Sequence, residues 1–156
     1  MGRRLKQAAV VLVLVFAAAQ LVRPGRANPP TDPSRTIQAH VGTASGLAAV
    51  LDRSCGDCHS NATAWSSWYT QIAPLSWLMA HEVAGGRKAV NFSEWAAYPP
   101  EQRRLLLSVS CDDAKSGKMP GPYTFFKPDT RLSAEEIETI CKAAGQTEAK
   151  ATKAFR

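Results

Sequence analysis

The sequence predicts an all-α domain, and three observations support this fold class. Apolar residues recur at helical spacing in several segments, no segment alternates long enough for a sheet, and Ser133 to Glu136 form a capping box. The 156 residues suffice for one small domain, with 45% hydrophobic and 21% charged residues. These ordinary globular values disfavour a disordered chain, a collagen-like repeat and a polytopic membrane protein.

The net charge of +6 is a weak signal because many basic residues lie near the two ends of the chain. The central part is close to neutral. A nucleic-acid partner would require clustered basic residues with interleaved aromatic residues in the folded part, and the sequence has no such cluster. We therefore expect no nucleic-acid partner.

Residues 1–27 are predicted to be an N-terminal signal or anchor segment. Ala8 to Val22 are apolar except for Gln20, and three basic residues precede them, namely Arg3, Arg4 and Lys6. This is the pattern of an export signal. The expectation is a retained single-pass anchor in the inner membrane, with the remaining chain facing the periplasm. Small residues at Ala17–Ala19 and Gly25–Ala27 keep the alternative open, which is secretion to the periplasm after signal cleavage.

A proline-rich spacer, a helical domain and a flexible tail are predicted to follow, at residues 28–34, 35–146 and 147–156. Three prolines keep the spacer extended. The first two helices of the domain are expected over Ile37–Leu51 and Trp68–Ala84, and Gly85–Gly86 are predicted to end the second.

The second half of the domain is predicted to hold two helices around a loop. Pro99 and Pro100 open a helix that continues to about Ala114. Ser116–Thr130 is rich in Gly and Pro and is expected to be an ordered loop. The capping box at Ser133 then starts the last helix.

The motif Cys55-Gly-Asp-Cys58-His59 is the signature of covalent c-type haem attachment. Two thiols one helical turn apart reach the two haem vinyl groups, and the imidazole that follows is the proximal iron ligand. A zinc site would require a second close pair of ligands. A thioredoxin-like redox pair would require a preceding strand and a βαβ frame. The sequence provides neither, so one covalent haem c is the predicted cofactor.

Met119 is the predicted sixth ligand of the haem iron. It lies in the Gly- and Pro-rich loop before the last helix, where a small cytochrome c places its thioether. His81 is the alternative ligand. Met79 has the spacing of a core residue on a helix, and His40 precedes the haem motif on a segment that contains glycine.

Cys111 and Cys141 are left over from the haem motif and are candidates for a disulfide. They flank the Met119 loop, and an oxidising compartment would favour pairing. The alternative is two buried thiols that never meet, because sequence alone does not show the distance between their Cα atoms.

The sequence resembles the bacterial haem-binding domain family of small, membrane-anchored, cytochrome c-like proteins. The resemblance covers about Asn28 to Ala144 and is carried by five segments: Cys55–Trp65, Ile72–Trp77, His81–Arg87, Asn91–Trp95 and Met119–Pro120. It implies a cytochrome c-like helical fold, an uncleaved anchor and a c-type haem on Cys55, Cys58 and His59. Met119 matches the usual distal methionine. The Cys111 and Cys141 pair departs from the family pattern, and so does Lys127, which stands where a His is common.

Together these features predict a monohaem electron carrier outside the cytoplasm rather than an enzyme. A thioether opposite an imidazole leaves no iron position for a substrate. The expected partner is a redox protein or a membrane quinol-linked donor. The alternative is a haem-based sensor of small ligands, or a weak peroxidase, with an open or labile sixth position.

Overall fold

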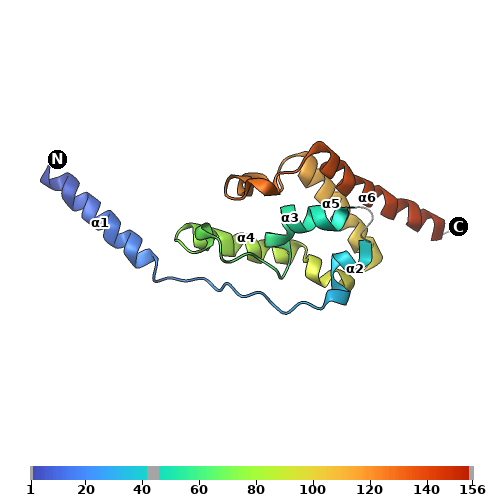
Figure 1. Ribbon diagram of the computed structural model, residues 1–156, viewed down its shortest axis with the longest axis horizontal. Coiled ribbons are helices and arrows are strands. Elements are labelled where there is room, and N and C mark those ends of the chain that lie inside the picture. The colour runs from blue at the N-terminus through green and yellow to red at the C-terminus, as the bar shows by residue number, and fades with distance from the viewer. Residues whose placement is uncertain (1, 42–45, 155–156) are drawn as a thin grey trace.

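The computed structural model describes residues 2–41 and 46–154, with side chains as far as residue 145. The described residues form helices and no strand, which confirms the all-α class (Figure 1). The α-helices are α1 Arg3–Ala19, α2 Ile37–Val41, α3 Leu47–His59, α4 Leu75–Ala89, α5 Pro100–Lys115 and α6 Ala134–Ala154. Short 3-10 helices join them: η1 Pro33–Arg35, η2 Trp68–Thr70, η3 Phe92–Ala97, η4 Gly121–Phe125 and η5 Pro128–Thr130.

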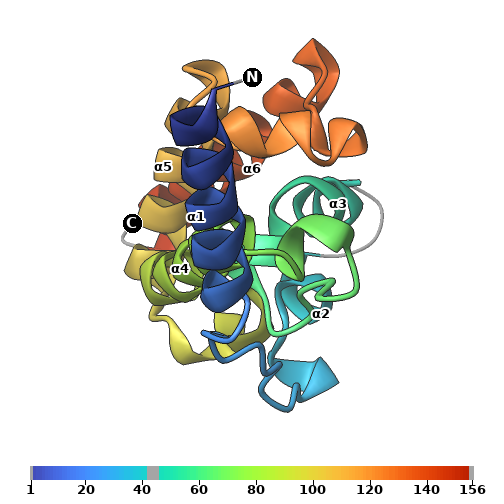
Figure 2. The same cartoon turned by 90° about the vertical axis from the view of Figure 1, so that its left-hand side faces the viewer.

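The hydrophobic core lies where α3, α5 and α6 meet α2 and η3. Helices α5 and α6 lie side by side in both views (Figures 1 and 2). The buried apolar side chains of this cluster are Ile37, Leu47, Leu51, Val90, Phe92, Trp95, Leu107, Cys111, Ala114 and Ile140. This core holds the first part of α3 and leaves the end of α3, with the cysteine motif, at its edge.

The N-terminal apolar segment forms α1, which projects away from the helical domain (Figure 1). Helix α1 has 17 residues, and at 1.5 Å per residue it spans about 25 Å, less than the roughly 30 Å of a bilayer core. Among the described residues, no helix combines the length and the apolar character needed to cross a membrane. The prediction of a single-pass inner-membrane protein is therefore wrong.

The segment after α1 is hydrogen-bonded to the helical domain, although only a stiff spacer was expected at residues 28–34. The side chain of Gln20 accepts from the N–H of Ala73 and donates to its carbonyl oxygen, at 2.9 and 3.3 Å. The indole of Trp77 donates to the carbonyl of Val22 at 2.8 Å. The amide of Asn28 donates to the Thr63 carbonyl at 3.0 Å. Residues 20–28 thus run along the domain, and we call this segment the strap.

Both helices predicted for the first part of the domain have wrong boundaries. Of the helix expected over Ile37–Leu51, residues 37–41 form α2, residues 42–45 lie outside the described residues, and residues 47–51 begin α3, which continues through the cysteine motif to His59. Gly46, directly before α3, has a φ of 67°, a conformation that glycine adopts without strain. The helix expected over Trp68–Ala84 begins later, at Leu75, because Trp68–Thr70 form the separate η2. Helix α4 also does not end at Gly85–Gly86 but continues to Ala89, and Gly86 packs against α3, as described below.

The capping box at the start of α6 is confirmed. The N–H of Glu136 donates to the Ser133 hydroxyl at 3.2 Å, and the N–H of Ser133 donates to the Glu136 carboxylate at 2.8 Å. Helix α6 extends to Ala154, through most of the segment expected to be a flexible tail. The last two residues of that tail lie outside the described residues. Cys141 of α6 and Cys111 of α5 form a disulfide that joins the two helices.

Candidate functional site

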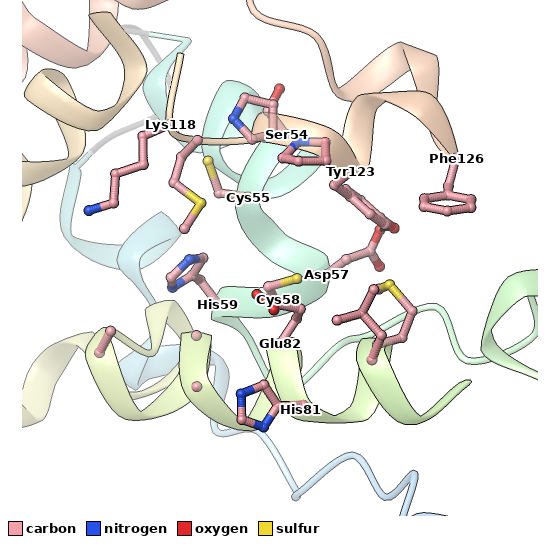
Figure 3. Close-up of a pocket in the computed structure, with 18 residues that line it drawn as sticks. Ser54, Cys55, Asp57, Cys58, His59, His81, Glu82, Lys118, Tyr123 and Phe126 are labelled. Atoms are coloured by element: carbon pink, nitrogen blue, oxygen red, sulfur yellow. Dashed lines mark hydrogen bonds between the residues drawn. The ribbon is translucent and has the colours of Figure 1, made fainter. Parts of the chain in front are cut away.

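The last turns of α3 place the cysteine motif on the wall of a cavity of about 430 Å³. Residues three and four positions apart share one face of a helix, so Cys55, Cys58 and His59 lie together (Figure 3). Helix α4 forms a second wall, and the loop from Lys118 to Phe126 forms a third. The volume lies within the 300 to 1,000 Å³ that is typical of cofactor pockets.

The two motif cysteines are free thiols with raised pKa values. Burial raises the pKa of Cys55 to about 12 and that of Cys58 to about 11. Both thiols are therefore protonated at neutral pH. A Cys-x-x-Cys pair that exchanges disulfides has a lowered pKa instead, so this environment argues against a thioredoxin-like pair.

The ring of His59 has a defined tautomer. Its Nδ1 lies 3.2 Å from the carbonyl oxygen of Val90, and a carbonyl only accepts hydrogen bonds, so Nδ1 carries the proton. Burial lowers the pKa of His59, although hydrogen bonds to the backbone at Val90 and Gly86 oppose this effect. The neutral ring keeps an unprotonated Nε2. This is the form in which imidazole binds a metal.

Helix α4 approaches the motif closely because glycine stands at the contact. Gly86 is buried, and a Cβ at this position would overlap the carbonyl group of Cys58. Gly85 lines the cavity, and a Cβ there would meet nothing. Ala89 and Leu78 continue this wall as apolar residues, and His81 and Glu82 add polar side chains to it.

Met119 lies on the same cavity as the cysteine motif. Met119 is 38% exposed. Met79, which belongs to α4, is 5% exposed and also lines the cavity. His81, the alternative ligand, is exposed and also lines the cavity. His40 does not line it, and its Nδ1 lies 2.9 Å from the carbonyl oxygen of Thr36 in the preceding turn. The structure thus brings Cys55, Cys58, His59 and Met119 together, with His81 on the same cavity.

A polar cluster beside the motif was not predicted from the sequence. The carboxylate of Asp57 accepts from the Tyr123 hydroxyl at 2.8 Å and from the Lys127 ammonium at 2.8 Å. It also accepts from the N–H of Ala64 at 2.9 Å. Burial alone would raise the pKa of Asp57, but these hydrogen bonds and the positive charge of Lys127 hold it below its ordinary value. The only signal in the sequence was the acidic residue inside the motif. Its side-chain partners, Tyr123 and Lys127, lie 66 and 70 residues further along the chain.

Tyr123 and Phe126 line the cavity next to this cluster, and the buried Tyr69 packs against both rings. The rings of Tyr69 and Tyr123 are edge to face at 6.0 Å, and Phe126 lies 5.4 Å from Tyr69. The two tyrosine hydroxyls are hydrogen-bonded at 3.0 Å. Such rings supply large apolar surfaces with few rotatable bonds.

Arg87 joins the strap to the loop that follows the motif. Its guanidinium donates to the carbonyl oxygens of Ser60 and Ala27, at 2.7 and 3.0 Å, and to the Asn28 side chain at 2.8 Å. A further bond reaches the Thr63 hydroxyl at 2.9 Å. Arg87 therefore fixes the backbone directly after His59.

Within residues 2–41 and 46–154, no group of three or more His, Cys, Asp or Glu side chains is placed to hold a metal ion. The zinc alternative for the cysteine motif therefore has no ligand set among the described residues. A thiol pair, one imidazole and a thioether that line one mainly apolar cavity suit a large flat cofactor better than a bare ion.

One comparison with known proteins identifies a family. The model of the haem-binding domain family matches residues 14–146, which is most of the chain. No curated protein and no solved structure matches the chain. The matched range includes α3, α4 and the loop that carries Met119.

Proposed function

Because the chain belongs to the haem-binding domain family, we propose that it holds one covalent c-type haem and carries single electrons. One observation carries this proposal. Cys55, Cys58, His59 and Met119 come from two segments far apart in the sequence and line the same cavity. These are the two thioether-forming residues and the two axial ligands that such a cytochrome needs.

The cavity fits this cofactor in shape and in chemistry. Its walls are mainly apolar, and the small residues Gly85, Gly86 and Ala89 keep the α4 wall open for a flat ring. The groups that could bind the cofactor are two thiols and an imidazole on α3 and a thioether on the loop. Sulfur and imidazole are the groups that haem proteins use for attachment and axial ligation.

Covalent attachment uses the two protonated thiols. The cofactor would supply two vinyl groups, and Cys55 and Cys58 would supply the two S–H groups that add across them, sulfur to one carbon and hydrogen to the other, with no electron gained or lost. Raised pKa values keep both residues in the S–H form, and they lie one helical turn apart on α3.

His59 and Met119 are the residues that would ligate the iron. The Nδ1–H of His59 donates to the Val90 carbonyl, which orients the ring and leaves Nε2 as the ligand atom. The Met119 thioether favours the ferrous state and raises the reduction potential. When bound, haem supplies a one-electron couple at the iron. With both axial positions filled, the iron has no place for a substrate, which favours a carrier over an enzyme.

The electron partner is proposed to be a redox protein or a quinol-linked donor. Large exposed apolar side chains near the cavity suit a transient protein contact: Phe125 is 82% exposed and Trp68 is 60% exposed. Aromatic side chains are common at such interfaces.

Co-expression with the c-type haem maturation machinery tests the proposal. We expect the intact mass to increase by one haem per chain and the pyridine haemochrome spectrum to be that of haem c. The Cys55→Ala, Cys58→Ala double variant should carry no covalent haem. A wild-type protein that releases all of its haem into acidified organic solvent would refute covalent attachment.

The exposure of Met119 supports a second candidate function, a haem-based sensor of small ligands or a weak peroxidase. A thioether that is 38% exposed on a loop is easier to displace than a buried one. The ferric absorption spectrum separates the two functions. A far-red thioether-to-iron charge-transfer band supports the carrier, and a high-spin band supports the sensor.

A further inference from the structure

The loop that carries Met119 has little apolar anchorage of its own. No residue from 115 to 129 is fully buried, although the loop forms one wall of the cavity. Burial of apolar side chains is what ordinarily fixes a loop. The position of this loop must therefore depend strongly on hydrogen bonds and on partial ring contacts.

One end of the loop is tied to α5. The N–H of Met119 donates to the Asp113 carbonyl at 3.1 Å, and the Lys118 ammonium lies 3.1 Å from the Asp113 carboxylate. Lys118 is 68% exposed, so water and salt screen this ion pair strongly. These bonds fix where the loop leaves α5. They do not hold its far part across the cavity.

The far part of the loop is tied to the haem motif itself. Tyr123 and Lys127 both donate to one oxygen of the Asp57 carboxylate, each at 2.8 Å. The side chain of Asp57 is 9% exposed, and the other carboxylates in ion pairs of the described residues are at least 22% exposed. Hydrogen bonds to a shielded charge are stronger than those at an exposed surface. We call Asp57, Tyr123 and Lys127 the Asp57 latch.

We propose that the Asp57 latch holds the Met119 loop across the cavity and thereby controls whether a small molecule reaches the sixth iron position. Asp57 lies between the two motif cysteines on α3, so the latch connects the segment that carries the proximal ligand directly to the loop that carries the distal one. The three residues are positioning residues. The inference rests on the proposed function, because it assumes that Met119 is the distal ligand.

The ring contacts around Tyr69 hold the loop in the same position, in addition to the hydrogen bonds of the Asp57 latch. Tyr69 is buried and hydrogen-bonds to the Tyr123 hydroxyl at 3.0 Å. Since Tyr123 donates to Asp57, Tyr69 is left as the donor to Tyr123, which orients both hydroxyl groups. The latch thus fixes a ring on the cavity wall as well as the loop backbone. Loss of Asp57 would leave Lys127 and Tyr123 without their shared acceptor.

The test uses the haem-loaded protein and five variants: Asp57→Ala, Lys127→Met, Glu94→Gln, Met119→Ala and the Asp57→Ala, Met119→Ala double variant. Glu94→Gln is the matched control, because it removes the carboxylate of the Arg35 ion pair, at 2.8 Å, without touching the loop. Two quantities are measured. They are the association constant of imidazole with the ferric protein and the rate of amide hydrogen exchange over residues 117–127.

We expect Asp57→Ala to raise the imidazole association constant roughly tenfold, as the loss of a charge-assisted hydrogen bond predicts. Lys127→Met should raise it by a smaller factor, and Glu94→Gln should leave it unchanged. Exchange over residues 117–127 should be faster in both latch variants. In a Met119→Ala background, Asp57→Ala should add little to imidazole binding, because the competing thioether is already gone.

Unchanged loop exchange in both latch variants would overturn the proposal. Should Asp57→Ala fail to fold by circular dichroism, Lys127→Met decides, because its side chain is only partly buried at the loop end. A wild-type spectrum that survives Met119→Ala would refute the proposed ligand set instead. Hydrogen exchange tests the latch in either case, because it reports the loop position without reference to the ligand.

Discussion

Gly86 of α4 packs against the backbone carbonyl of Cys58, so closely that a Cβ at residue 86 would overlap it. This contact accounts for the glycine at position 86, inside a helix that continues to Ala89. Another residue at position 86 would have a higher helix propensity, but its Cβ would prevent this direct contact between α4 and α3. The distance between α3 and α4, and therefore the width of the cavity, is set at this glycine.

Gly86→Ala should destabilise the protein, whereas Gly85→Ala should not. The added methyl group at residue 86 forces α3 and α4 apart, which costs about 1 to 3 kcal/mol. At residue 85 a Cβ meets nothing, so the variant should gain up to about 1 kcal/mol of helix propensity. Urea unfolding followed by circular dichroism measures both. Equal midpoints for the two variants would contradict the close packing of α3 and α4.

Met119→Ala should convert a low-spin ferric spectrum to a high-spin one and lower the midpoint potential. The reason is loss of the thioether that favours ferrous iron. Met79→Ala is the matched control, because Met79 is buried on the same cavity. It should cost about 2 to 5 kcal/mol of stability and leave the spin state unchanged. If His81→Ala alone removes the low-spin spectrum, the iron has two histidine ligands.

The sequence predicted the features that depend on neighbouring residues and missed several contacts between residues that are far apart in the chain. The capping box of Ser133 and Glu136 formed as predicted because its partners lie three residues apart. The role of Gly86 was missed because it depends on α3, which is distant in sequence. The pairing of Asp57 with Lys127 was missed for the same reason, since no local pattern connects residues 70 positions apart.

The membrane prediction failed for a different reason. The apolar composition of the N-terminal segment indicates an export signal or an anchor, but it does not determine how long the helix becomes. In the structure α1 ends at Ala19, and Gln20 is bonded to Ala73 of the domain. Helix length depends on where the chain begins to pack against other residues, and hydropathy alone does not contain this information.

Arg87→Ala should destabilise the segment after the haem motif, whereas Lys88→Ala should not. Arg87 donates to the backbone oxygens of Ser60 and Ala27, so its loss removes one of the connections between the strap and the domain. The expected cost is about 2 kcal/mol, because charged donors make the stronger hydrogen bonds. Lys88 is the exposed neighbour and is the control. Limited proteolysis should cleave residues 20–30 faster in Arg87→Ala alone, and equal cleavage of both variants would refute the role of Arg87.

Removal of the Cys111–Cys141 disulfide should lower stability and loosen the Met119 loop together. The bond closes a loop of 30 residues, for which chain entropy predicts a contribution of roughly 3 to 4 kcal/mol. It also joins the end of α5 to α6, the two helices between which the Met119 loop runs.

The Cys111→Ala, Cys141→Ala variant is compared with the wild type by urea unfolding and by imidazole binding to the ferric protein. We expect a lower unfolding midpoint and tighter imidazole binding, because a loop less constrained at its base lets the thioether leave the iron more often. A lower midpoint with unchanged imidazole binding would show that the disulfide does not control the loop position. Free-thiol counting on the denatured, unreduced wild type should find no thiol in Cys111 or Cys141, and two reactive thiols there would refute the pairing itself.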